Sequence, residues 1–194
     1  MDLTGLLNEA LNSDTIKQIS QELEVDEGMT GEAIQAAMPM LLGGLANNSA
    51  SQSGVSSLLG ALDRDHDGSI LDDLGGYLED YLSGRGASIL GHIFGGNQGA
   101  VEEGVSQASG LDLSKVGPLL MMLAPIVMGA LGKMRREGEV GAGELPRELS
   151  SATQQAGGSE GLLGTLSSIL DRNRDGSVID DIAGMLSRAV GGRG

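Results

Sequence analysis

A twelve-residue acidic stretch occurs twice in this sequence, at residues 63–74 and 171–182. The first copy reads DRDHDGSILDDL and the second reads DRNRDGSVIDDI, so the acids, the glycine and the apolar residues recur in register. The spacing Asp-x-Asp-x-Asp-Gly is typical of an EF-hand-type calcium loop between two helices, because calcium prefers six to eight oxygen ligands that such a loop supplies. The repeated stretch therefore predicts two calcium loops, each between an entering and an exiting helix.

The predicted ligands are side-chain oxygens at loop positions 1, 3 and 5, a backbone carbonyl at position 7, and an acid that closes the loop. In the first copy they are Asp63, Asp65, Asp67, the carbonyl of Ser69, and Asp73 or Asp72. In the second copy they are Asp171, Asn173, Asp175, the carbonyl of Ser177, and Asp181 or Asp180. Position 6 is glycine in both copies, where the sharp turn favours positive φ.

The end of each loop departs from the usual pattern. Position 12 normally holds a bidentate glutamate, but Leu74 and Ile182 stand there, and acids occupy positions 10 and 11 instead. We expect the acid at position 11 to close each loop, which requires the exiting helix to begin closer to the ion, because aspartate is one methylene shorter. Such loops resemble bacterial EF-hand-like and dockerin-like loops. Ile70 and Val178, at position 8, are expected to form a strand-like bridge between paired loops.

An alternative interpretation is an acidic turn whose last aspartates only cap a helix. The repetition of the same ligand pattern favours calcium. The first loop has five aspartates and one arginine, and the second has four aspartates and two arginines. Because ligand charge tunes affinity, we expect the first loop to bind more tightly, with dissociation constants of about 10⁻⁵ to 10⁻³ M.

Outside the loops, apolar residues recur at helical spacing and no long stretch alternates as a strand does, which predicts an all-α fold. Helices are expected at 3–11, up to residue 23 after a cap at Ser13 or Asp14, and at 30–45, 55–62, 88–94 and 116–131, with a linker at 46–54. Leu71, Leu74, Leu78 and Tyr81 form one stripe of the first exiting helix. Only three residues are aromatic, so the core consists of aliphatic side chains and methionine.

The two halves of the chain resemble each other. Ile19-Ser20-Gln21 returns as Val105-Ser106-Gln107, and Pro39 returns as Pro125, both 86 residues later. The acidic loops are 108 residues apart, so the second half carries about 22 extra residues. We interpret the chain as a tandem-duplicated helical domain, with repeats at 1–95 and 96–194 and a Gly-, Glu-, Arg- and Ser-rich linker at about 132–161.

Charge and composition narrow the function. A net charge of −15 argues against nucleic acid as a partner, since phosphate binding needs a basic patch. No secretory signal pattern is present, so a cytoplasmic location is expected. The apolar run 116–131 is shorter than the roughly 20 residues that span a bilayer, and we expect a buried core helix rather than membrane contact. His66 and His92 do not have the spacing of a zinc site. The sequence contains no recognisable set of catalytic residues, so we do not expect an enzyme.

The segment AAMPMLLGGL at 36–45, followed by a Gly- and Ser-containing gap and the acidic loop, resembles the bacterial domain-of-unknown-function family 937, which includes the YidB-like proteins. That resemblance implies a small helical bacterial protein without catalytic residues. The expected function is non-enzymatic calcium binding that stabilises or switches the helix packing. The alternative is a metal-independent scaffold in which methionine-rich helices bind a protein partner or form a homo-oligomer.

Overall fold

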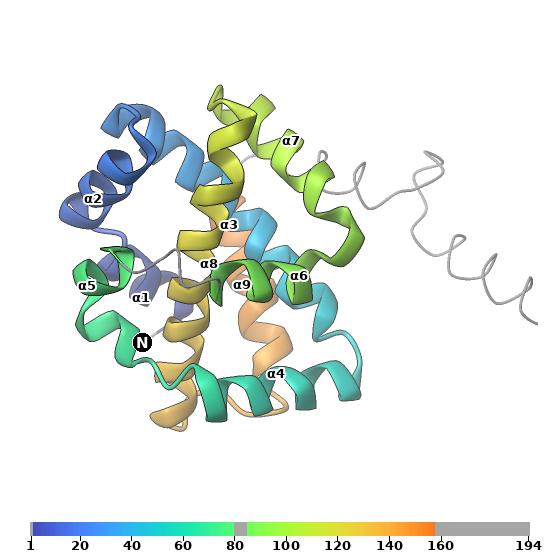
Figure 1. Ribbon diagram of the computed structural model, residues 1–194. Helices are drawn as coiled ribbons and strands as arrows, with labels where there is room; N and C mark the ends of the chain where they lie inside the picture. Colours follow the sequence, from blue (N-terminus) through green and yellow to red (C-terminus); the bar gives the residue numbers. More distant parts are fainter. Residues whose placement is uncertain (1, 80–84, 158–194) are drawn as a thin grey trace, which may run out of the picture. The chain divides into compact units, whose positions relative to one another are not determined.

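A computed structural model describes residues 2–79 and 85–157, all within one compact unit that spans Met1–Gly157. The described residues are helical and contain no strand, which confirms the predicted all-α class. Figure 1 shows the helices arranged around one long helix, α8. Their bounds are α1 Leu3–Ala10, α2 Ser13–Leu23, α3 Glu27–Asn48, α4 Gln52–Asp65, η1 Ser69–Asp72, α5 Leu74–Glu79, α6 Arg85–Phe94, η3 Gly95–Asn97, α7 Gln98–Ser109, α8 Leu113–Arg136 and α9 Leu145–Ala156.

Helix α8 is the centre of the core. Every residue from Met122 to Gly132 is buried, and α1, α2, α3, α4, α6, α7 and η1 all pack against it. A helix that is apolar on all sides is stable in water only inside such a layer of other helices. Of the described helices, α8 alone is long and apolar enough to cross a membrane, and 78% of its most apolar window is buried within the protein.

Pro125 lies inside α8, close to a contact with α6. Pro125 has no N–H, so the carbonyl of Met121, four residues earlier, lacks its usual helical donor. Helix α6 crosses α8 at this carbonyl through Gly86, where an added Cβ would lie 2.1 Å from the Met121 oxygen. Glycine is therefore required at position 86, because any side chain would push α6 away from the core.

Capping residues determine where the helices begin and end. Asp26 accepts hydrogen bonds from the N–H groups of Gly28 and Met29, so α3 begins at Glu27 rather than at the expected Thr30. Asn12 caps α2 in the same way, in place of the expected cap at Ser13 or Asp14. Helix α3 also continues to Asn48, and α4 begins at Gln52, so most of the predicted linker at 46–54 is helical.

The stretch expected to be a linker at 132–161 contains the end of α8 and all of α9. Leu145 and Leu149 of α9 are fully buried and Ala152 is 1% exposed, and the helix packs on α3 and α1. These three residues follow helical spacing, but the glycines and charged residues around them obscured the pattern. Helix α9 is therefore part of the core.

Candidate functional site

The first acidic loop connects α4 to α5 on one side of α8. Asp63 and Asp65 lie in the last turn of α4, and the chain turns at Gly68 with a φ of 89°. Positive φ at loop position 6 was predicted from the sequence and is confirmed. Ser69–Asp72 then form a 3₁₀ turn, and α5 begins at Leu74. The exiting helix is thus split into a 3₁₀ turn and a short α-helix.

Two glycines on α8 allow this loop to pack closely against the helix. A Cβ on Gly132 would lie 1.6 Å from the carbonyl oxygen of His66, and a Cβ on Gly129 would lie 2.2 Å from Cγ2 of Ile70. Ile70 therefore packs into the face of α8 from a 3₁₀ turn, while Val178, its expected partner in a strand-like bridge, lies outside the described residues. The packing of Ile70 has a local reason, since two glycines three residues apart leave a notch that an aliphatic side chain fills.

Basic residues at the end of α8 lie beside the acidic loop. Arg135 donates from Nε to Oδ1 of Asp63 at 3.0 Å and from Nη2 to Oδ2 at 3.3 Å. This hydrogen bonding from Arg135 lowers the pKa of Asp63, and Asp63 in turn raises the pKa of Arg135. The predicted ligand at loop position 1 thus holds a guanidinium in this structure.

Two other predicted ligands bind backbone N–H groups. Asp67 accepts from the N–H of Ser69 at 3.0 Å, and hydrogen bonds from the side chain and backbone of Ser69 lower the pKa of Asp67. Asp73 accepts from the N–H of Gly76 at 3.0 Å, within the first turn of α5. Asp73 therefore caps a helix, as the alternative interpretation predicted for the last acid of the loop.

Asp65, Ser69 and Asp72 are exposed. Across residues 2–79 and 85–157, no three His, Cys, Asp or Glu side chains lie together in a group that could hold a metal. The second predicted loop lies outside the described residues, and so do its ligands Asp171, Asn173, Asp175, Ser177, Asp180 and Asp181.

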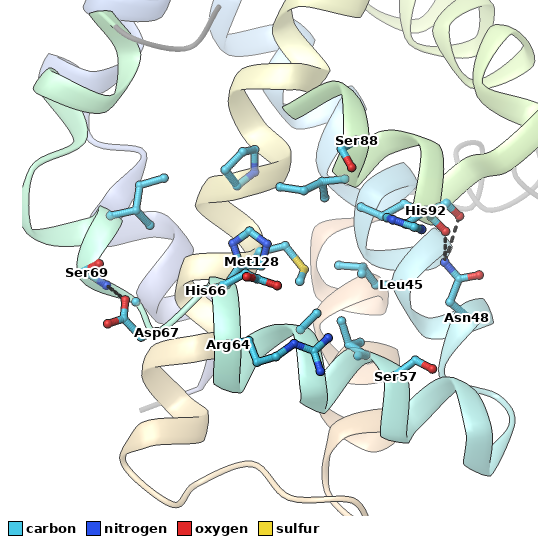
Figure 2. A pocket seen from close by; sticks show the side chains of 18 of the residues that line it. Leu45, Asn48, Ser57, Arg64, His66, Asp67, Ser69, Ser88, His92 and Met128 are labelled. Atoms are coloured by element: carbon cyan, nitrogen blue, oxygen red, sulfur yellow. Dashed lines mark hydrogen bonds between the residues drawn. The ribbon is translucent and has the colours of Figure 1, made fainter. Parts of the chain in front are cut away.

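A cavity of about 1080 Å³ lies beside the loop, between α4 and α6 and over α8 (Figure 2). Sequence reasoning did not find it, because its lining comes from five α-helices (α3, α4, α5, α6 and α8) and the loop, and no single segment carries a motif. His66 is half-buried and lines this cavity. His92 lies at the opposite side in Figure 2, on α6.

Asn48 fixes the edge of the cavity near His92. Its Nδ2 donates to the carbonyl oxygens of His92 and Ile93, both at 3.0 Å (Figure 2). These carbonyls lie at the C-terminal end of α6, where helical donors run out. The end of α3 and the end of α6 are thereby joined, and this contact holds one wall of the cavity in place.

Comparisons with known proteins place the chain in a family. No curated protein and no solved structure matches it. One family model, described as bacterial protein of unknown function (DUF937), matches residues 5–134. The match spans more than half of the chain and includes the first acidic loop and most of α8, and the chain therefore belongs to the DUF937 family of bacterial proteins.

Proposed function

We propose that this protein is a non-enzymatic calcium-binding protein, in which the loop at 63–73 binds one ion and the stretch at 171–181 binds a second. The observation that carries the proposal is the turn at Gly68. Its positive φ lies at position 6 of the loop, directly after the third carboxylate, as an EF-hand-type loop requires. The donors are all oxygens, which is the set that a hard cation such as calcium prefers.

The ion pair between Asp63 and Arg135 is compatible with this proposal. Both Asp63 oxygens already bind a cationic group, and the side chains of Asp63, Asp65 and Asp67 are exposed, so a metal reaches them from solvent. Binding calcium requires Asp63 to release Arg135 and requires the other carboxylates to turn toward the ion. The divalent charge relieves the repulsion among five aspartates in twelve residues, which one arginine relieves only in part.

Calcium at this loop would join the end of α4 to the start of α5. Because Gly129 and Gly132 hold the loop on α8, the ion would also fix both helices on the core. Binding that occurs only in the folded state stabilises that state by mass action. We therefore propose calcium as a stabiliser or a switch of the packing of α4 and α5.

Calorimetric titration of the chelator-stripped chain with calcium, and then with magnesium, tests the proposal. We expect calcium to bind with dissociation constants of about 10⁻⁵ to 10⁻³ M and magnesium to bind more weakly. Asp63→Ala combined with Asp171→Ala should abolish or strongly weaken the binding. Glu32→Gln is the matched control, since it removes one negative charge from an exposed position on α3. Calcium binding that is unchanged in the double variant would refute the assignment.

A second candidate function is a metal-independent scaffold. The specific observation in its favour is that Arg135 and the helix cap at Asp73 already satisfy two of the predicted ligands. The mass of the protein in solution, measured with calcium and with chelator, separates the two proposals. A dimer that is indifferent to calcium would favour the scaffold, whereas a calcium-dependent change would favour the metal site.

We also infer that the chain arose by tandem duplication, and the helix ends support this. Glu24 follows the last residue of α2 and Gly110 follows the last residue of α7, and these two C-cap residues are both in the left-handed conformation and 86 residues apart. Asp26 and Asp112, again 86 residues apart, then cap α3 and α8. The offset of 86 residues derived from the sequence thus recurs in these helix ends, and this recurrence supports the proposed duplication.

A further inference from the structure

The C-terminal end of α8 brings positive charge to the acidic loop. Three basic residues lie in the last turn of this helix: Lys133, Arg135 and Arg136. The loop approaches Lys133 so closely that a Cβ on Gly68 would lie 2.8 Å from its backbone nitrogen. Arg136 acts on Asp67, whose pKa is lowered first by hydrogen bonds from Ser69 and then by the charge of Arg136. The loop thus has counter-ions within the chain itself.

Arg135 connects this loop to the turn that follows α8. Its Nε and Nη2 donate to the two carboxylate oxygens of Asp63, and its third nitrogen, Nη1, donates to the backbone carbonyl of Val140 at 3.5 Å. A guanidinium that donates twice to one carboxylate is held in a fixed plane. Asp63 therefore orients the whole group, and the long contact with Val140 depends on that orientation.

The turn after α8 is mostly exposed. The chain reverses at Gly138, which has a φ of 77°, and the N–H of Glu139 donates to the carbonyl of Met134 at 2.9 Å. This is the bonding of a Schellman motif, which satisfies the last carbonyls of a helix. Residues 136–139 are exposed, and such a segment opens at a low cost in free energy. Val140 is 1% exposed, so it is the buried point at which Arg135 holds the turn.

We propose that calcium and Arg135 exchange at Asp63, and that this exchange loosens the turn at 137–141. The inference rests on the proposed calcium site and adds its regulation. Without metal, Arg135 supplies the positive charge at loop position 1 and holds the turn through Val140. When calcium binds Asp63, Arg135 loses the carboxylate that orients it, and the Val140 carbonyl loses its donor. The metal state of the loop is thereby coupled to the order of the turn.

The basic residues have a simpler explanation, which the test must exclude. Cations near the C-terminus of a helix interact favourably with its dipole, and all three lie there. That effect involves neither Asp63 nor Val140, so it predicts no response of the turn to calcium. The exchange instead predicts responses of opposite sign, because calcium adds order to the loop and removes the contact that orders the turn.

Hydrogen exchange of the full chain, followed by mass spectrometry in EDTA and in saturating calcium, tests the inference. We expect calcium to slow exchange at residues 63–76 and to speed exchange at 137–141 by about two- to five-fold, the range that corresponds to loss of an exposed ion pair. Arg135→Gln should exchange fast at 137–141 already in EDTA, and calcium should add nothing further. Arg147→Gln, at an exposed position of α9, is the matched control and should behave like the parent chain.

Asp63→Asn is a second variant, which removes the carboxylate instead of the guanidinium. In EDTA it should speed exchange at 137–141 as Arg135→Gln does. If calorimetry shows that calcium binds the parent chain while exchange at 137–141 is unchanged, this inference is wrong and the calcium site remains. If calorimetry shows no binding, the calcium site and the exchange both fail. Equal exchange of Arg135→Gln and Arg147→Gln at 137–141 in EDTA would overturn the inference whatever calcium does.

Discussion

Arg135 and Asp63 are 72 residues apart in sequence and joined by two hydrogen bonds, at 3.0 and 3.3 Å. The pair connects the last turn of α4 to the last turn of α8, and it lies at position 1 of the proposed calcium loop. If calcium binds as proposed, the same carboxylate would have two competing cations, one supplied by the chain and one by solvent. Arg135 would then set how readily Asp63 is available to the metal.

Replacing Arg135 with glutamine should raise the calcium affinity of the first loop. The substitution removes the competing cation and keeps a side chain of similar length. We expect an increase of about two- to five-fold, the range that corresponds to loss of an exposed ion pair. Calorimetry of Arg135→Gln beside Arg147→Gln measures it. Equal affinities in the two variants would show that Arg135 does not compete with calcium.

The ion pair between Asp63 and Arg135 also predicts that the stability of the protein depends on pH in the acidic range. The pKa of Asp63 is lowered in the folded chain, chiefly by its hydrogen bond to Arg135, from an ordinary value of 3.8. A lowered pKa contributes stability that is fully present above 3.8 and is lost as the pH falls through the folded value. In EDTA, Asp63→Asn should therefore lose less stability than the parent chain between pH 5 and pH 2, measured by urea unfolding. Parallel losses in the two proteins would contradict the assignment.

How the loop sits on α8 was not foreseeable from the sequence. The glycine at position 6 follows from the motif, since a sharp turn with positive φ requires it. The notch formed by Gly129 and Gly132 does not, because glycines inside an apolar helix give no sign of which segment approaches them. The same limit applies to Arg135, whose partner Asp63 is brought close only by the packing of α4 on α8.

Helix positions were more predictable than helix ends. The apolar spacing identified α1, α2, α3, α4, α6 and α8 because each buries one face or more in the core. The start of α3 at Glu27 depended on the cap by Asp26, and aspartate occurs too often in this acidic chain to mark a cap by itself. Helix α9 was missed because three buried residues in a glycine-rich stretch give a weak periodic signal.

Gly132→Ala should destabilise the protein by displacing the loop. The new Cβ would overlap the carbonyl of His66, a backbone atom that moves only if the whole turn moves. Overpacking of this kind costs about 1–3 kcal/mol. Gly91→Ala is the matched control, because nothing lies within 4 Å of its Cβ, and it should stabilise α6 by roughly 0.5–1 kcal/mol. Urea unfolding measures the free energy of unfolding of both variants. If Gly132→Ala is no less stable than Gly91→Ala, the loop does not need a glycine at position 132 to pack on α8.

Leu149→Ala should be among the more damaging substitutions outside α8. Leu149 is fully buried on α9, which packs on α3, and truncating such a leucine costs about 2–5 kcal/mol. Gln154→Ala, at an exposed position of the same helix, should change the free energy of unfolding by no more than about 0.5 kcal/mol. Similar unfolding midpoints for the two variants would mean that α9 does not belong to the core.

Substitutions at the two left-handed turns, Glu24 and Gly110, should change the stability of the protein in opposite directions. Both residues are left-handed, with φ of 52° and 74°, and a residue with a Cβ pays about 1–2 kcal/mol for that conformation, whereas glycine does not. Glycine loses more chain entropy on folding, which offsets about half of the difference. Glu24→Gly should therefore stabilise the protein by about 0.5–1 kcal/mol, and Gly110→Ala should destabilise it by a similar amount. The ion pair of Glu24 with Lys115 is long, at 3.8 Å, and Glu24 is largely exposed, so its loss should not reverse the sign. Thermal unfolding of both variants, with Glu24→Gln as the control for charge, decides whether the two turns are equivalent.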